Sequence, residues 1–166
     1  MSKTGILVLF TGNSERSIPG EALLGRAGAG RVAAYSAGSR PAGSVNPGAI
    51  RLLIRKGFDV NAFRSKSWTE VTGPTSPHID IALTVCGSAA GETCPVFPGS
   101  PARGHWGLSD PALAEGDEAE IDRVFERTFE LLEARVNALL ALPFETMDRR
   151  ELEKHLAVIG AMEGAA

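Results

Sequence analysis

A polar segment with one arginine follows the first apolar run of the chain. Residues 5–10 are apolar without alternation, and Pro19 with the apolar residues after it predicts a helix that begins near Ser17. Backbone N–H groups in such a strand-to-helix turn converge at the helix N-terminus, where an oxyanion is favoured. An ordinary connecting loop has a similar composition. The predicted loop consists of Phe10, Thr11, Gly12, Asn13, Ser14, Glu15, Arg16 and Ser17.

Three residues outside this loop carry further chemically active groups. Asp110 precedes Pro111, Cys86 follows an apolar run at residues 79–85, and Cys94 lies among many Gly and Pro residues. A carboxyl can serve as a general acid, but an Asp before Pro is also a common turn cap. Two cysteines are too few for a secreted disulfide framework, and a buried cysteine is often only a small apolar group.

The histidines do not predict a metal centre. His78 and His105 have no Cys or His at zinc-ligand spacing, so we interpret both as structural or surface residues. We expect no organic cofactor.

Apolar runs alternate with helical patterns along the chain. Strands are predicted at residues 5–10, 31–37, 79–85 and 103–107, and helices at residues 17–28, 49–56, 118–142 and 148–160. Asn46 and Pro47 form a helix start, Gly57 a helix end, and Asp148 with Glu151 a capping box. The tail after residue 160 is expected to fray. The long helix has an apolar stripe of Ile121, Val124, Phe125, Phe129, Leu132, Val136 and Leu139 or Leu140.

This order predicts an α/β fold. Right-handed crossovers between the strands give a three-layer α/β/α arrangement, with an open parallel sheet of about four strands and the first strand central. A chain of 166 residues with 43% hydrophobic residues suits one domain spanning residues 1–166. Ligands are expected at the carboxyl ends of the strands.

Charge and hydropathy exclude several function classes. The net charge of −3 comes from scattered acids and bases without a dense basic block, so a nucleic-acid partner is not expected. No apolar stretch approaches about 20 residues and residues 1–5 show no signal peptide, so we expect a cytoplasmic protein without membrane contact.

Motifs along nearly the whole chain resemble low-molecular-weight protein tyrosine phosphatases and the related thioredoxin-coupled arsenate reductases. In that family a phosphate-binding loop (P-loop) has Cys, five residues, Arg and Ser in order, and Arg16 with Ser17 matches its end. The stretches Cys-Pro-Val-Phe-Pro-Gly at 94–99 and His-Trp-Gly at 105–107 resemble the arsenate reductase branch, whose members serve arsenic resistance. The similarity also includes residues 21–24, 35–39, 64–68, 84–86 and 105–111.

The resemblance implies a role for each matching residue. Arg16 would bind the equatorial oxygens of arsenate or phosphate with two donors, and Asp110 would be the general acid. Cys86 and Cys94 match the redox pair that closes a disulfide, which thioredoxin then reduces. The family's low-molecular-weight phosphatase-like fold agrees with the predicted sheet.

The nucleophile is the main departure from the family pattern. The position of the nucleophilic cysteine is Phe10, which has no atom that could attack an oxyanion. Glu15 would place a carboxylate near a bound anion, at a cost of about 4 kcal/mol per charge pair at 4 Å and an effective dielectric near 20. Alternatively, Glu15 turns outward to solvent or pairs with Arg16.

Several functions therefore stay open at this stage. The first is an oxyanion-binding pseudoenzyme that has lost turnover but keeps the two thiols. The second is an active arsenate reductase or phosphatase in which Cys86 replaces the nucleophile, and the third is a partner-binding domain whose pocket is filled by Phe10. Introduced substitutions in an active parent would give the same sequence.

A structural potassium ion is a weaker expectation from the same resemblance. Asn13, Glu21 and Ser36 match positions that surround potassium in some arsenate reductases. The fourth expected acid is not evident near Arg64 and Ser65.

Overall fold

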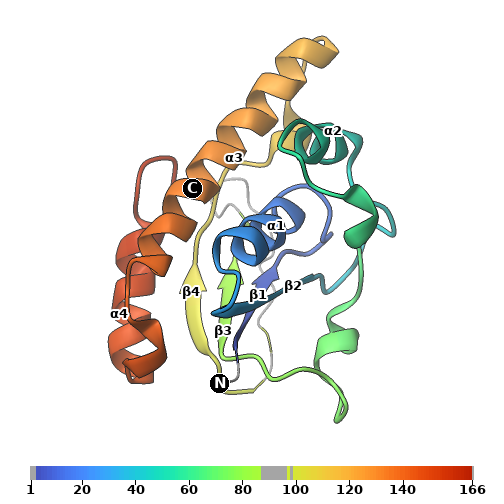
Figure 1. Cartoon of the computed structure of the whole chain (residues 1–166). Coiled ribbons are helices and arrows are strands. Elements are labelled where there is room, and N and C mark those ends of the chain that lie inside the picture. The colour runs from blue at the N-terminus through green and yellow to red at the C-terminus, as the bar shows by residue number, and fades with distance from the viewer. Residues whose placement is uncertain (1–2, 87–96, 98, 166) are drawn as a thin grey trace.

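The described part of the chain is built on a four-stranded parallel sheet with strand order β2-β1-β3-β4. The computed structural model describes residues 3–86, 97 and 99–165 (Figure 1). The strands are β1 (Thr4–Leu9), β2 (Val32–Ala37), β3 (Ile81–Thr84) and β4 (Ala102–His105). Because β1 lies between β2 and β3, the predicted central position of the first strand is confirmed.

Four α-helices occur where the sequence predicted them, with ends shifted by a few residues. They are α1 (Ser17–Ala27), α2 (Pro47–Arg55), α3 (Glu118–Leu140) and α4 (Arg149–Gly160). Asn46 caps α2 by accepting a hydrogen bond from the Gly48 N–H at 2.8 Å. Asp148 caps α4 by accepting from the Glu151 N–H at 2.8 Å. The described residues also form four short 3-10 helices that were not predicted: η1 (Val60–Ala62), η2 (Trp68–Val71), η4 (Pro111–Leu113) and η5 (Phe144–Thr146).

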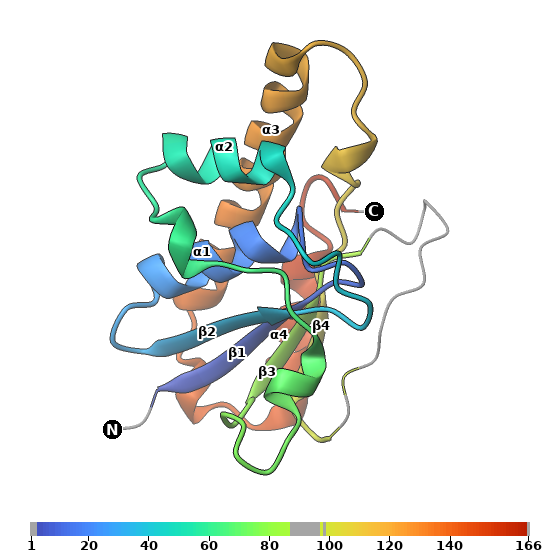
Figure 2. The ribbon, with the colours of Figure 1, turned by 90° about the vertical axis from the view of Figure 1, so that its right-hand side faces the viewer.

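Both faces of β1 are buried, which explains its continuous apolar run. Ile6 and Val8 belong to the large core cluster, to which all four helices contribute side chains. Leu7 and Leu9 point to the opposite face, into a smaller cluster with residues such as Val71 of η2. Figures 1 and 2 show the helices on one side of the sheet and the segment with η2 on the other. The three-layer prediction is therefore confirmed, although the second face is covered by short elements.

The apolar stripe of α3 is confirmed except at one residue. Phe125, Phe129, Leu132, Val136 and Leu139 are buried in the large core cluster. The side chain of Val124, in contrast, is 40% exposed, so its assignment to the stripe was wrong. A helix turns about 100° per residue, which places Val124 on the flank of the stripe rather than over the sheet.

The segment after α4 is held against α3 rather than frayed. The buried Arg135 donates hydrogen bonds to the Met162 and Glu163 carbonyls at 3.1 and 3.2 Å. Ala165 pairs in an antiparallel bridge with Leu108. Since these backbone groups have protein partners, the predicted fraying is wrong for residues 161–165. Burial lowers the pKa of Arg135.

None of the described helices is long and apolar enough to span a membrane.

A substitution at Gly5 tests the tight contact beside the first strand. A Cβ atom at Gly5 would lie 2.0 Å from the His78 carbonyl oxygen, so the backbone would have to move. We expect Gly5→Ala to lower the free energy of unfolding by about 1–3 kcal/mol in urea denaturation. Gly25→Ala is the control, because it meets nothing nearer than 3.8 Å within α1 and should stabilise by about 0.5–1 kcal/mol. Equal effects at the two glycines would contradict this packing.

Candidate functional site

The 10–17 loop connects β1 to α1 at the carboxyl edge of the sheet, as predicted. The Phe10 N–H donates to the Ala37 carbonyl at 3.2 Å, which continues the contact between β1 and β2. The Thr11 and Gly12 carbonyls accept the N–H groups of Arg40 and Ala42, each at 2.9 Å. The start of the loop is therefore fixed against the segment that follows β2.

Asn13 holds the middle of the loop in an unusual conformation. Its φ of 46° lies in the left-handed region, and no other non-glycine residue in the described part of the chain has a positive φ. Its Nδ2 donates to Ser17 Oγ at 2.9 Å, and its Oδ1 accepts the Lys66 N–H at 2.8 Å. Ser65 Oγ donates to the Gly12 carbonyl at 3.0 Å. Residues 65–66 thus help to determine the shape of the loop.

Arg16 is fully buried at the end of this loop. Its Nη1 donates to the Leu108 carbonyl at 2.7 Å. Its guanidinium carbon lies 4.2 Å from the centroid of the Phe10 ring, a cation–π contact. The residue at the position of the expected nucleophile therefore covers one face of the guanidinium.

Two carboxyl groups also approach the Arg16 guanidinium. Glu15 Oε1 lies 3.9 Å and Asp110 Oδ2 lies 3.7 Å from Arg16 Nη2. Glu15 is only 7% exposed, so the alternative in which it turns outward is wrong and the pairing with Arg16 is confirmed. Asp110 Oδ1 also accepts the Ala112 N–H at 2.9 Å, so the interpretation of Asp110 as a cap is confirmed, and its Oδ2 faces the loop.

The surroundings of Glu15 raise the pKa of its carboxyl to near neutral pH. Burial, and then the charge and hydrogen bonding of Asp110, raise the pKa of Glu15 from 4.5 to about 7, while Arg16 opposes the shift. Near neutral pH the carboxyl is therefore divided between its neutral and charged forms. An oxyanion next to Arg16 would meet less repulsion when Glu15 carries a proton.

Cys86 lies at the same sheet edge as the loop. Leu9 pairs with Thr84, so Phe10 and Cys86 follow neighbouring strands just beyond their paired residues. The Cys86 side chain is buried in the large core cluster, and its sulfur is in a disulfide bond. Cys94 falls outside the described residues. The predicted place of Cys86 at the end of a strand is correct.

The residues proposed for potassium have partners other than an ion. Ser36 Oγ donates to Glu21 Oε1, and Lys66 Nζ lies 3.7 Å from that oxygen. Burial raises the pKa of Glu21, while Lys66 and Ser36 oppose the shift. Because the Asn13 Oδ1 is used by the Lys66 N–H, two of the three residues already interact with Lys66 and do not fit a potassium ion. Lys66 was not among the predicted site residues, and its position beside Ser65 was the available signal.

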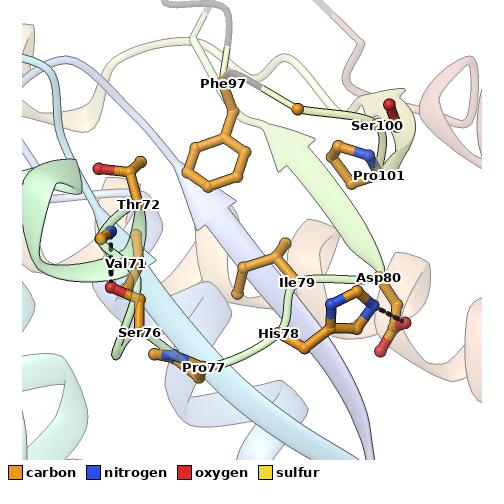
Figure 3. A pocket seen from close by; sticks show the side chains of 12 residues that line it. Val71, Thr72, Ser76, Pro77, His78, Ile79, Asp80, Phe97, Ser100 and Pro101 are labelled. Carbon is orange, nitrogen blue, oxygen red and sulfur yellow. Dashed lines mark hydrogen bonds and ion pairs between the residues drawn. The ribbon is translucent and has the colours of Figure 1, made fainter.

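A separate cavity lies at the other end of the sheet. It measures about 540 Å³ and is bordered by residues that precede β3 and β4, among them Ile79 and Pro101 (Figure 3). At its edge His78 Nε2 lies 3.0 Å from Asp80 Oδ1. His105 Nδ1 lies 2.7 Å from Thr84 Oγ1. Within the described residues no group of three His, Cys, Asp or Glu side chains could hold a metal ion.

The strand-loop-helix site at the carboxyl edge of a parallel α/β sheet places the chain in a known class of domain. The pattern of the low molecular weight phosphotyrosine protein phosphatase family matches residues 5–156. The chain therefore belongs to that family.

Similar proteins within the family are arsenate reductases. The chain is 36% identical over 137 residues to an arsenate reductase of Bacillus licheniformis, with 82% of this chain and 94% of the relative covered. A solved arsenate reductase from Archaeoglobus fulgidus has a TM-score of 0.59 at 25% identity, covering 81% of this chain and 99% of the other. A thioredoxin-dependent arsenate reductase from Corynebacterium glutamicum has a TM-score of 0.53 at 25% identity, covering 84% and 64%.

The raised pKa of Glu15 predicts a stability difference that depends on pH. The folded state binds the proton of Glu15 more tightly than the unfolded state, so this stabilisation is complete below pH 4.5 and is lost as pH rises through about 7. We expect Glu15→Gln to be more stable than the wild type by about 1–2 kcal/mol at about pH 8. This value is smaller than the full pKa shift would give, because Glu15 keeps some contact with solvent. The difference should vanish at about pH 4, as measured by urea denaturation.

Glu145 provides a control, because its pKa is shifted in the opposite direction to that of Glu15. Its hydrogen bond with Arg31 lowers the pKa of Glu145 to about 2, so Glu145→Gln should destabilise the protein above pH 4.5. A Glu15→Gln effect of the same size at every pH would show that the carboxyl does not titrate as described.

Proposed function

We propose that this protein is a catalytically silent member of the arsenate reductase branch, with an oxyanion loop that its own Glu15 carboxylate closes near neutral pH. The contact that carries the proposal is the engagement of Arg16 by Phe10, Glu15 and Asp110 at 4.2, 3.9 and 3.7 Å. Arsenate or phosphate would have to compete with two carboxyls for the same guanidinium. Binding of an oxyanion is therefore weak while Glu15 is charged.

The absence of a nucleophile in the loop supports the loss of turnover. Residues 10–17 contain no cysteine, and the resemblance assigns the nucleophile's position to Phe10. A phenyl ring can form neither a phosphocysteine nor a cysteine–arsenate adduct. Cys86, which follows the strand next to β1, is buried and in a disulfide, which leaves it without a free thiolate in this state.

The disulfide of Cys86 supports a retained redox exchange with thioredoxin. In that exchange a thioredoxin thiolate attacks one sulfur of the disulfide, and its second thiol releases the protein as a dithiol while thioredoxin becomes oxidised. The similar protein of Corynebacterium glutamicum is described as thioredoxin-dependent. The buried position of Cys86 limits access of a thioredoxin thiolate to its sulfur, so this reduction is slow.

Restoring the thiol and removing the carboxylate tests the loss of turnover. We expect the wild type to show no arsenate-dependent oxidation of reduced thioredoxin and no hydrolysis of para-nitrophenyl phosphate. The double variant Phe10→Cys with Glu15→Ala should exceed it by about 100-fold or more in at least one assay, because a thiolate next to Arg16 can then attack the oxyanion.

The matched control is Phe10→Ala with Glu15→Ala, which opens the same space without a thiol and should stay silent. Turnover by the wild type would contradict the proposal and make Cys86 the nucleophile to test. Silence of the variant with Cys at position 10, despite native folding and anion binding, would remove Phe10 as the cause of inactivity.

Binding of phosphate and arsenate should depend on the charge of Glu15. By calorimetry, we expect the wild type to bind phosphate about 10-fold or more tightly at about pH 5.5 than at about pH 8, because Glu15 is then neutral. Glu15→Gln should bind at both pH values. The dianionic form of phosphate decreases at low pH, so sulfate, which keeps its charge, is the control anion. No binding of any anion by either protein would favour a partner-binding domain with a sealed pocket.

A further inference from the structure

Lys66 contacts the 10–17 loop and the two elements next to it, at the end of β2 and in α1. Its backbone N–H donates to Asn13 Oδ1 at 2.8 Å, and its carbonyl accepts the Gly38 N–H at 2.9 Å. Its Nζ lies 3.7 Å from Glu21 Oε1 and donates to the Arg64 carbonyl at 3.2 Å. One residue thus connects the loop, the end of β2 and helix α1.

The Glu21 carboxylate needs a cation at this place. The side chains of Glu21 and Lys66 are only 14% and 13% exposed, so little water is available to solvate either charge. A carboxylate in such surroundings is stabilised by a paired charge or a bound cation. Lys66 is a compact point charge on a flexible stem, which allows its ammonium to fill a position that a monovalent metal ion would otherwise occupy.

We propose that the Lys66 ammonium is the resident cation of the oxyanion loop, and that the loop keeps its shape without a bound metal ion. Lys66 is then a positioning residue: its backbone holds Asn13 in the left-handed conformation, and its side chain neutralises Glu21 of α1. Removal of the ammonium leaves the Glu21 carboxylate and the Ser36 hydroxyl as an oxygen-rich site that accepts potassium.

The experiment compares melting temperatures in potassium, sodium and choline chloride at equal ionic strength. The wild-type melting temperature should be the same in all three salts within about 1 °C. Lys66→Met should melt about 5 °C or more below the wild type in choline, because the Glu21 charge is left without its partner. Potassium should restore most of that loss, and sodium less. Amide exchange of residues 11–16 should accelerate and recover in the same order.

Two variants separate this role from a general effect of removing a lysine. Lys56 also pairs with a carboxylate, that of Glu126, but between α2 and α3 and away from the loop. Lys56→Met should therefore show no recovery that is specific to potassium. The double variant Lys66→Met with Glu21→Gln has neither charge, so it should fold equally well in all three salts.

Three results would overturn the proposal. The first is a wild-type melting temperature that rises in potassium but not in sodium. The second is a Lys66→Met variant that potassium does not rescue, and the third, should that variant fail to fold, is a double variant that also fails. No oxyanion is present in these measurements, so they stand apart from the proposed function.

Discussion

A positive charge without solvent contact is the constraint on which the functional end of this molecule depends. The Arg16 side chain is fully buried, and a guanidinium cannot lose its charge as a lysine or histidine can. Its surroundings must therefore supply negative charge, hydrogen-bond acceptors or aromatic faces. In this chain Glu15, Asp110, Leu108 and Phe10 supply all three kinds of partner.

The same constraint relates the two unusual loop residues to each other. A loop that binds an oxyanion satisfies its arginine with a ligand, whereas in this loop an aromatic ring and two carboxyl groups contact the arginine. Phe10 and Glu15 contact the same guanidinium, so the two residues form one physical unit. A change at either position alone leaves the other still in contact with Arg16.

Much of the fold and the residues of the loop could be predicted from local patterns, and the contacts that these residues make could not. The buried run of β1, the caps Asn46 and Asp148 and the core stripe of α3 depend on nearest neighbours along the chain, so the sequence contained their signal. The position of Lys66 beside Glu21 depends on a contact between segments far apart in sequence. Whether Glu15 turns outward or pairs with Arg16 likewise depended on the packing around it. The assignment of Val124 to the apolar stripe of α3 was wrong because periodicity shows which face of a helix is apolar but not where the edge of that face lies.

The position of Arg16 in the 10–17 loop depends on contacts made by the segment after α4, at the far end of the described chain. Arg135 fixes residues 162 and 163, Ala165 pairs with Leu108, and the Leu108 carbonyl receives Arg16. These last residues lie beyond the span that the family pattern matches. A protein fused directly after this segment, or a protease that trims it, would therefore act on the arginine of the loop through a single backbone carbonyl.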